Sequence, residues 1–250
     1  MVIILRTLSK PSEKSVDFKK VPFPLSTTKT KEAFSALRIL SAGVAHEIRN
    51  PLAVIQSLVE LLAQKNQDKE QEALVEAIVT EIKRLNHFLG EFIEYGRVPE
   101  LNYESTHIGP LLKKALYFAI TPEQKSKLLI RTDIPDHLPP VQIDPDAVHQ
   151  VLVNAILNAV QAMQGKGKLE IQAIRSKQRF MIKIKDSGPG IPSENLEKIF
   201  VPFFTTKRNG SGLGLAISQQ IVTQHGGCMR FKNNGDEGGV TLSIELPHSG

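Results

Sequence analysis

The chain has 250 residues, of which 41% are hydrophobic and 23% charged, so it can form one large or two modest globular domains with real cores. No stretch is long and apolar enough to span a bilayer, and the apolar residues 2–5 are too few for the core of a signal peptide. The single cysteine, Cys228, excludes an internal disulfide and a cysteine-cluster metal site, and we expect it to be a core residue of a cytoplasmic protein.

Residues 1–29 are rich in lysine, proline and serine, and we expect a short strand followed by a linker. Pro22 and Pro24 oppose a helix in this segment. The net charge of +5 is modest, and the lysines here indicate a solvated tail or a segment near an anionic membrane surface. No recognition motif accompanies the charge, so we expect no nucleic-acid partner.

A long helix is expected from about residue 30 to residue 65. Apolar or small side chains recur there at alternating spacings of three and four, as in the seam of a helical bundle, at Phe34, Leu37, Ser41, Val44, Ile48, Pro51, Ile55, Leu58 and Leu62. His46 then falls at the outermost heptad position, with Glu47 beside it and Asn50 one turn further on. A histidine is more often a packing or surface residue, but an exposed imidazole on a rigid helix is suited to attack on a group brought from outside. Pro51 predicts a kink one turn after His46.

A second helix follows a polar connection at residues 64–69, and Gly96 and Pro99 end it. Its apolar residues repeat the same spacing at Val75, Ile78, Ile82, Leu85, Leu89 and Phe92. One antiparallel helix pair cannot cover so wide an apolar stripe by itself, so we expect two copies to form a four-helix bundle. The alternative is a hairpin packed on its own C-terminal domain. Residues 30–98 are therefore predicted to be a dimeric helical domain.

Residues 99–250 mix helices and strands, which favours a two-layer α/β sandwich. A helix is expected at 108–119, and another begins after Asp144-Pro145, an N-cap aspartate with proline in the first turn. Strands are expected at 128–134 and 141–143, as an antiparallel pair at 169–174 and 180–186, and as a second pair at 228–232 and 240–246.

Two segments of this second domain carry polar groups suited to a nucleotide. Asn154 and Asn158 share one face of an otherwise apolar helix, where a ligand or hydrated metal would satisfy their amides. Asp186 follows a predicted strand and is followed by Gly188 and Gly190. A carboxylate at such a position can accept a hydrogen bond from an exocyclic amine, and the glycines let a ring approach closely.

A third segment contains Gly210, Gly212 and Gly214 and opens a helix predicted from Leu213 to Gln224. Free N–H groups and the positive end of the helix dipole at such a terminus suit phosphate. A dinucleotide fold is disfavoured, because the acidic residue expected about twenty positions later is absent.

Taken with the preceding motifs, the chain resembles a sensor histidine kinase of bacterial two-component signalling, from roughly residue 30 to its C-terminus. His46 lies in the H-box of that family, Asn154 and Asn158 in the N-box, and Asp186 to Gly190 in the G1 box. The motifs at 200–204 and 210–214 resemble the F-box and the G2 box. Residues 203–207 and the short gap before Gly210 are most similar to the nitrogen-regulation and sporulation kinases.

The resemblance implies a HisKA dimerisation domain followed, at residues 99–250, by a GHKL (Bergerat) ATP-binding domain. It implies that His46 is phosphorylated by ATP, with Glu47 as base or orienting group, and that the phosphoryl group passes to an aspartate of a response regulator receiver domain. Asn158 would bind Mg²⁺, Asn154 would lie near the phosphates or metal-bound water, and Asp186 would contact adenine.

The resemblance also implies roles around the nucleotide and the partner. The glycines Gly188, Gly190, Gly210, Gly212 and Gly214 and neighbouring Leu213, Thr206 and Lys207 would line the nucleotide site. Many relatives carry a lysine at the position of Gln161, so the cation near the phosphates is expected from Lys207 or Arg208. Of Phe200, Phe203 and Phe204, some are expected to pack under the loop that closes over the nucleotide and one against the helical bundle, the alternative being that they are core residues. Asn50 would help to dephosphorylate the regulator, the alternative being an amide that eases the kink.

Two other functions were weighed against a kinase that phosphorylates itself. A phosphotransfer or scaffold module would keep the helical dimer without using ATP, but the intact glycine motifs and both asparagines argue against it. A GHKL ATPase acting on DNA or protein conformation would leave the His46 motif unexplained, and such relatives usually carry a glutamate where Asn154 stands.

Overall fold

The computed structural model describes residues 48, 52–62, 69–96, 100–176, 179–207, 210–235 and 238–247. His46, Glu47, Asn50 and the kink expected at Pro51 lie outside these residues, as do the expected strand and linker at 1–29. The domain boundaries drawn at residues 29 and 98 remain predictions.

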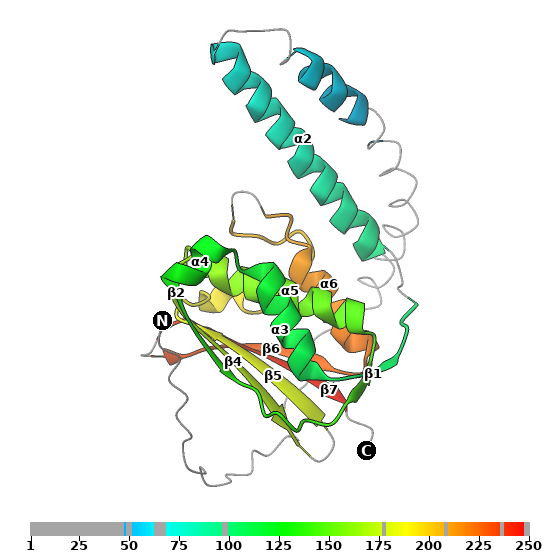
Figure 1. Cartoon of the computed structure of the whole chain (residues 1–250), viewed down its shortest axis with the longest axis vertical. Coiled ribbons are helices and arrows are strands. Elements are labelled where there is room, and N and C mark those ends of the chain that lie inside the picture. The colour runs from blue at the N-terminus through cyan, green and yellow to red at the C-terminus, as the bar shows by residue number, and fades with distance from the viewer. Residues whose placement is uncertain are drawn as a thin grey trace.

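Two helices form a hairpin at one end of the molecule. The first covers residues 52–62, and the second, α2, covers Lys69–Gly96, with the chain reversing between them (Figure 1). The expected polar connection at 64–69 is one residue too long, because Lys69 already belongs to α2. The end at Gly96 is confirmed.

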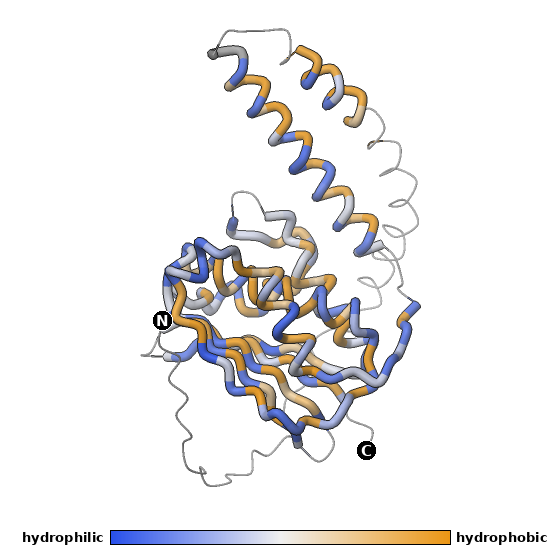
Figure 2. Tube along the Cα trace, in the orientation of Figure 1, coloured by the Kyte–Doolittle hydropathy of each residue, from blue (hydrophilic) through white to orange (hydrophobic). Residues whose placement is uncertain are grey.

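The apolar side chains of the hairpin are only partly covered within one chain. Ile82 and Leu89 are buried, whereas Ile55, Leu58 and Ile78 are 45%, 55% and 45% exposed. Figure 2 shows hydrophobic positions recurring along both helices up to the far end of the hairpin. A stripe of this kind is normally covered by another molecule or domain.

The α/β domain begins with short elements. Strand β1 (Glu104–Thr106) pairs antiparallel with β3 (Val141–Ile143), and helix α3 (Ile108–Ala119) lies between them in sequence, as the spacing predicts. Helix α4 (Pro122–Lys127) was not foreseen. It has six residues and is set by a local capping box, in which Thr121 accepts from the backbone of Gln124 and the side chain of Gln124 accepts from the backbone of Thr121.

The main sheet has five strands in the order β2-β4-β5-β7-β6. They are β2 (Leu128–Asp133), β4 (Gly167–Arg175), β5 (Arg179–Asp186), β6 (Cys228–Asn233) and β7 (Val240–Pro247). Both antiparallel pairs expected from the sequence, β4–β5 and β6–β7, are confirmed. The expectation of separate pairs is incomplete, because β5 also pairs with β7 and β2 pairs parallel with β4. The β2–β4 connection contains a helix, as parallel neighbours require.

Three helices cover one side of this sheet: α3, α5 (Pro145–Ala162) and α6 (Gly214–Gln224) (Figure 1). Alternate strand residues such as Ile171, Ile182 and Leu242 are buried beneath them, and the helices contribute buried faces of their own, so the core lies between the two layers. A short 3-10 helix, η1 (Ser193–Asn195), lies in the connection from β5 to α6.

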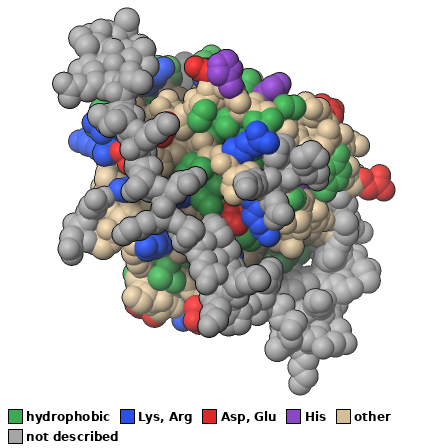
Figure 3. All heavy atoms as spheres, turned by 90° about the horizontal axis from the view of Figure 1, so that it is seen from below, with side chains coloured by type: hydrophobic (Ala, Val, Ile, Leu, Met, Phe, Trp, Pro, Cys, Tyr) green, Lys and Arg blue, Asp and Glu red, His purple; other side chains and the backbone are tan. Residues whose placement is uncertain are grey.

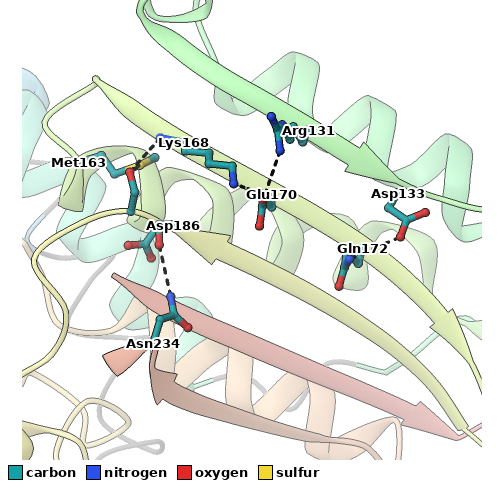
Figure 4. Close-up of polar contacts among 9 residues, drawn as sticks. Arg131, Asp133, Met163, Lys168, Glu170, Gln172, Asp186 and Asn234 are labelled. Carbon is teal, nitrogen blue, oxygen red and sulfur yellow. Dashed lines mark hydrogen bonds and ion pairs between the residues drawn. The ribbon is translucent and has the colours of Figure 1, made fainter. Parts of the chain in front are cut away.

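The other side of the sheet is polar. Glu170 accepts from Lys168 at 2.5 Å and lies 3.9 Å from Arg131, and Gln172 lies 3.4 Å from Asp133 (Figure 4). Among the described residues on the face seen in Figure 3, basic, acidic and apolar side chains are mixed.

Cys228 corrects one expectation. It is half-buried and lies opposite Glu245 in the β6–β7 ladder, not in the core. Burial and the neighbouring Glu245 carboxylate raise the pKa of its thiol. The raised pKa disfavours the reactive thiolate form.

Candidate nucleotide site

Asp144 is the N-cap of α5 and fixes where this helix begins. Its Oδ1 accepts from the backbone N–H of Ala147 at 2.9 Å and its Oδ2 from that of Asn102 at 2.9 Å, so the cap also holds the segment that follows the hairpin. Burial opposes the charge of the Asp144 carboxylate, but these N–H groups and nearby His225 bring its pKa below the ordinary value. The cap and Pro145 were both predicted from the sequence.

Two turns further along α5, Asn154 and Asn158 form a chain of hydrogen bonds with residues of two other segments. Asn158 Nδ2 donates to Asn154 Oδ1 at 3.2 Å, and Asn154 Nδ2 donates to Ser218 Oγ of α6 at 2.8 Å. At the other end, Lys207 Nζ donates to Asn158 Oδ1 at 2.5 Å and to Gln161 Oε1 at 2.6 Å. The chain therefore joins α5, α6 and the loop before Gly210.

Lys207 is one of the two cations expected near the phosphates, and the structure brings its ammonium to Gln161, the position at which many relatives carry a lysine. The residue as a whole is exposed, but its ammonium end lies between two amides of α5. This loss of solvent lowers the pKa of Lys207. Arg208, the other cation considered, lies outside the described residues.

Asp186 ends strand β5 and is buried. Its Oδ1 accepts from the backbone N–H of Gly188 at 2.8 Å and from that of Val240 at 3.3 Å. Burial raises the pKa of the Asp186 carboxyl, and the two N–H groups oppose this shift. Asp186 is thus a fixed acceptor at the C-terminal end of the central strand β5, and its position at a strand end agrees with the sequence analysis.

Two asparagines that the sequence analysis missed hold the loop after Asp186. Asn233 brackets Ile191, accepting from its N–H at 2.9 Å and donating to its carbonyl oxygen at 2.7 Å, and so fixes the segment next to Gly190. Asn234 donates to the backbone carbonyl oxygen of Asp186 at 3.5 Å (Figure 4). The consecutive asparagines at the end of β6 were the available signal, but their partners are over forty residues away.

Gly212 and Gly214 are required by close approaches at the start of α6. Gly212 has φ +72°, and a Cβ there would lie 2.5 Å from the backbone carbonyl carbon of Phe203. A Cβ at Gly214 would lie 2.8 Å from Asn154 Oδ1. Leu213, predicted to open the helix, is its N-cap, and its side chain is fully buried, so only its backbone can face a ligand.

The loop from Phe203 to Gly210 carries the remaining predicted residues. Its base is closed by the Phe203 N–H, which donates to Gly212 O at 3.1 Å, while Phe203 itself has φ +66°. Thr205 Oγ1 accepts from the backbone of Lys207 at 3.1 Å, and exposed Thr206 lies between them. Gly210 N donates to Lys207 O at 3.4 Å.

The aromatic residues before this loop divide as expected. The Phe200 ring packs against Phe231 of β6 at 5.7 Å between centroids, and both rings are partly buried against the core. The half-exposed Phe203 ring instead packs against Phe92 of α2 at 6.2 Å, and Phe92 stacks on Phe88 at 6.3 Å. The base of the loop therefore contacts the helical hairpin directly.

The site thus has a buried carboxyl acceptor at Asp186, a helix N-terminus at Gly214, an amide oxygen at Asn158 and an ammonium at Lys207. Such groups suit an amine-bearing base, a phosphate chain and a hard cation with neutral oxygen ligands. The described part of the chain contains no cluster of three or more histidine, cysteine, aspartate or glutamate side chains that could hold a metal ion.

Comparison with known proteins gives matches over both domains. The family model of the His Kinase A (phospho-acceptor) domain matches residues 36–100, and that of the histidine kinase-, DNA gyrase B- and HSP90-like ATPase matches residues 143–250. The sensor histidine kinase ZraS of Salmonella typhimurium strain LT2 is 36% identical over 225 residues, covering 89% of this chain and 48% of ZraS. The chain belongs to the histidine kinase family. It spans about half the length of the curated relatives that it matches.

Solved structures of histidine kinases have the same fold. The catalytic domain of ThkA is 30% identical with a TM-score of 0.55, covering 59% of this chain and 97% of that domain. ThkA in complex with the response regulator protein TrrA gives a TM-score of 0.66 at 30% identity and covers 88% of this chain and 64% of that one. Full-length ShkA in complex with AMPPNP gives a TM-score of 0.68 at 25% identity, over 84% of this chain and 45% of ShkA.

The predicted fold class, a helical HisKA domain followed by a GHKL-type α/β sandwich, is confirmed. Within the described ranges, none of the helices is both long and apolar enough to cross a membrane. The phosphoacceptor-domain match includes His46, Glu47 and Asn50, although these three lie outside the residues that the structure describes.

Proposed function

We propose that this chain is an ATP-dependent protein histidine kinase that phosphorylates His46 and passes the phosphoryl group to an aspartate of a response regulator. The main support for the proposal is that three segments distant in sequence come together near the start of α6. Asn154 of α5 contacts both Ser218 of α6 and, by close approach, Gly214, while Lys207 contacts Asn158. No structural need of the fold calls for so many polar groups around a glycine-rich helix start.

Each part of this site has a chemical role toward ATP. Asp186 would accept a hydrogen bond from the adenine amine, with Gly188 and Gly190 giving room for the ring. The free N–H groups at the start of α6, near Gly212 and Gly214, would bind phosphate oxygens. The Lys207 ammonium, with Thr206 next to it, would neutralise charge on the outer phosphates.

Magnesium fits the same arrangement. Asn158 Oδ1 is a neutral oxygen, of the kind that Mg²⁺ accepts in proteins, and Mg²⁺ commonly takes its other ligands from phosphates and water. Such a site needs few protein ligands, which agrees with the donor set around Asn158. The bound ion would bridge and neutralise phosphate oxygens during phosphoryl transfer.

His46 would supply the nucleophile. A neutral imidazole nitrogen attacks the γ-phosphorus, the bond to the β,γ-bridging oxygen breaks, and ADP leaves. Glu47 would take the proton from the other ring nitrogen. Because an ordinary histidine is largely neutral at pH 7, the chain mainly has to position the two reactants. The ATP requirement also supports a cytoplasmic location.

The exposed apolar stripe on residues 52–62 and α2 supports a homodimer, in which two hairpins form a four-helix bundle. The relative ThkA has been solved with a response regulator protein, and we propose a receiver domain as the partner of this chain as well. We propose no nucleic-acid partner.

Incubation of the purified chain with γ-labelled ATP tests the proposal. We expect label on the protein only with Mg²⁺, its loss in Asn158→Ala, and its transfer to one member of a panel of response regulators. A scaffold that does not use ATP would bind no nucleotide and take up no label, and that result would reject the kinase assignment.

Asn50 gives a second activity to test. Its side chain lies four residues after His46, on the same helix face if the predicted helix is continuous, and would place water against the phosphoaspartate of the regulator. We expect Asn50→Ala to slow dephosphorylation of the regulator in the presence of ADP while sparing phosphorylation of His46. Equal decay with both proteins would leave Asn50 a structural residue beside Pro51.

A further inference from the structure

Ser218 is a buried hydroxyl for which the proposed kinase chemistry gives no role. It lies on α6, four residues after Gly214, with 2% of its surface exposed. Its Oγ is 2.8 Å from Asn154 Nδ2, and Asn154 in turn accepts from Asn158. A series of hydrogen bonds thus runs from Ser218 through Asn154 and Asn158 to Lys207.

Lys207 determines the donor and the acceptor in every hydrogen bond of this series. An ammonium group has donors and no acceptor, so Asn158 must turn its Oδ1 toward Lys207. Asn158 Nδ2 then points at Asn154, which must present Oδ1 to receive it. Asn154 Nδ2 is left to donate, and Ser218 Oγ is the acceptor that it meets. Reversing either amide would place donor against donor.

A metal ion imposes the same orientation as the lysine, because it coordinates the amide oxygen and not the NH₂ group. The Lys207 ammonium and a divalent cation therefore both favour Asn158 Oδ1 turned outward. Without the Ser218 hydroxyl, the NH₂ group of half-buried Asn154 loses the acceptor that it has in the structure, and turning the amide over would direct this NH₂ group at Asn158 instead. A reversed Asn154 would then favour a reversed Asn158, with NH₂ toward the metal.

We propose that Ser218 is a positioning residue for the metal site: it holds Asn154, which holds Asn158 with its oxygen aimed at Mg²⁺. This inference rests on the proposed function, since it takes Asn158 as the metal ligand. In this arrangement Ser218 would act on the metal through two amides, without contacting the metal or the nucleotide itself. Groups that orient a metal ligand in this way typically change metal affinity by about 10-fold to 100-fold when they are removed.

The test is binding of trinitrophenyl-ATP, followed by fluorescence, as Mg²⁺ is titrated and again in EDTA. For Ser218→Ala we expect the Mg²⁺ midpoint to rise about 10-fold, with metal-free affinity changed by less than about 2-fold. Ser218→Cys keeps nearly the same size with a weaker acceptor, and we expect a shift in the same direction. Thr223→Ala removes an exposed hydroxyl from the same helix and is the matched control, for which we expect the wild-type midpoint.

The outcomes separate this inference from the proposed function. Wild-type binding that does not depend on Mg²⁺ would overturn the metal site itself. A wild-type Mg²⁺ dependence that Ser218→Ala leaves unchanged would overturn only the role of Ser218. A loss of affinity in Ser218→Ala that is equal with Mg²⁺ and with EDTA would mean that Ser218 merely supports the fold, and would also reject the inference.

Discussion

The helical hairpin and the α/β domain of this chain bury their apolar residues to very different extents. In the α/β domain, helices α3, α5 and α6 close over the five-stranded sheet, and residues such as Leu152 and Ile184 are almost completely buried. In the hairpin, Leu58 and Leu62 on one helix and Leu74 on the other are each more than half exposed. The described part of the α/β domain closes its core within a single chain, whereas the described part of the hairpin leaves large apolar side chains exposed.

The comparison also shows where the two domains meet. The end of α2 nearest the α/β domain is covered, because Phe88, Phe92 and Tyr95 pack against the core of that domain. Among the described residues, the far end of the hairpin keeps exposed leucines such as Leu62 and Leu74. Of the two packing alternatives considered from the sequence, packing on the same chain is observed near Phe92, and the dimer remains a proposal for the exposed stripe.

The largest effect is expected from a charge placed in the exposed stripe. Leu58→Asp should dissociate the proposed dimer, because burying a leucine contributes about 1.5–3 kcal/mol and the symmetric interface would contain it twice, giving roughly a 150-fold to 20,000-fold weaker association. Analytical ultracentrifugation measures this. Ser57→Asp, at an exposed neighbouring position, is the control. A Leu58→Asp dimer as tight as the wild type would mean that the stripe serves another contact.

A smaller loss is expected inside the complete domain. Asn158→Ala should weaken Mg²⁺-dependent ATP binding by at least about 10-fold, because the proposed metal ligand is lost, while the dimer persists. Calorimetry and sedimentation on the same sample give both quantities. Gln150→Ala on the same helix should change neither. If Asn158→Ala produces monomers, the division of labour between the two domains is wrong.

Asp144→Ala tests the start of α5. Loss of this N-cap should cost about 0.5–2 kcal/mol of unfolding free energy at pH 7. The folded pKa of Asp144 is lowered, so its stabilisation is fully present above the unfolded pKa, near 3.9, and is lost as pH falls through the lower folded pKa. The difference between variant and wild type in urea unfolding should therefore shrink as pH is lowered below about 3.9. Asp136→Ala, on an exposed turn, is the control; a difference that persists at low pH would contradict the assignment.

The smallest effect on stability is expected from substitutions at the contact between α2 and the α/β domain, where Phe92 packs on Phe203. A double-mutant cycle of Phe92→Ala and Phe203→Ala should yield a coupling of about 0.5–1.5 kcal/mol in unfolding free energy, as for other aromatic pairs. The same cycle with Phe200→Ala should give none, because Phe200 packs on Phe231 instead. Coupling in both cycles would indicate a general loosening of the core.

Local sequence signals predicted the elements that carry the site. Asp144-Pro145 marked the start of α5, and alternation of apolar residues gave β4, β5, β6 and β7. The parallel pairing of β2 with β4 was missed, because it depends on a crossover and not on the residues of either strand. The six-residue α4 was missed because so short a segment shows no periodicity.

The nucleotide motifs were likewise visible as residues but not as a connected structure. Asn154, Asp186 and Gly212 could be chosen from spacing and from resemblance to a family. Ser218 could not, because a serine on a buried helix face has no distinguishing pattern. Its hydrogen bond with Asn154 is visible only in the structure, where Gly214 lets α5 and α6 approach closely.

The central claim is that the helical domain accepts the phosphoryl group that the α/β domain donates, and the most direct measurement is the position of the phosphate. We predict that tandem mass spectrometry of the chain after incubation with Mg²⁺ and ATP, kept at alkaline pH, finds an acid-labile phosphate on His46. We predict that His46→Gln binds ATP as the wild type does and carries no phosphate. Phosphate on another residue, or an undiminished amount on His46→Gln, would contradict the account.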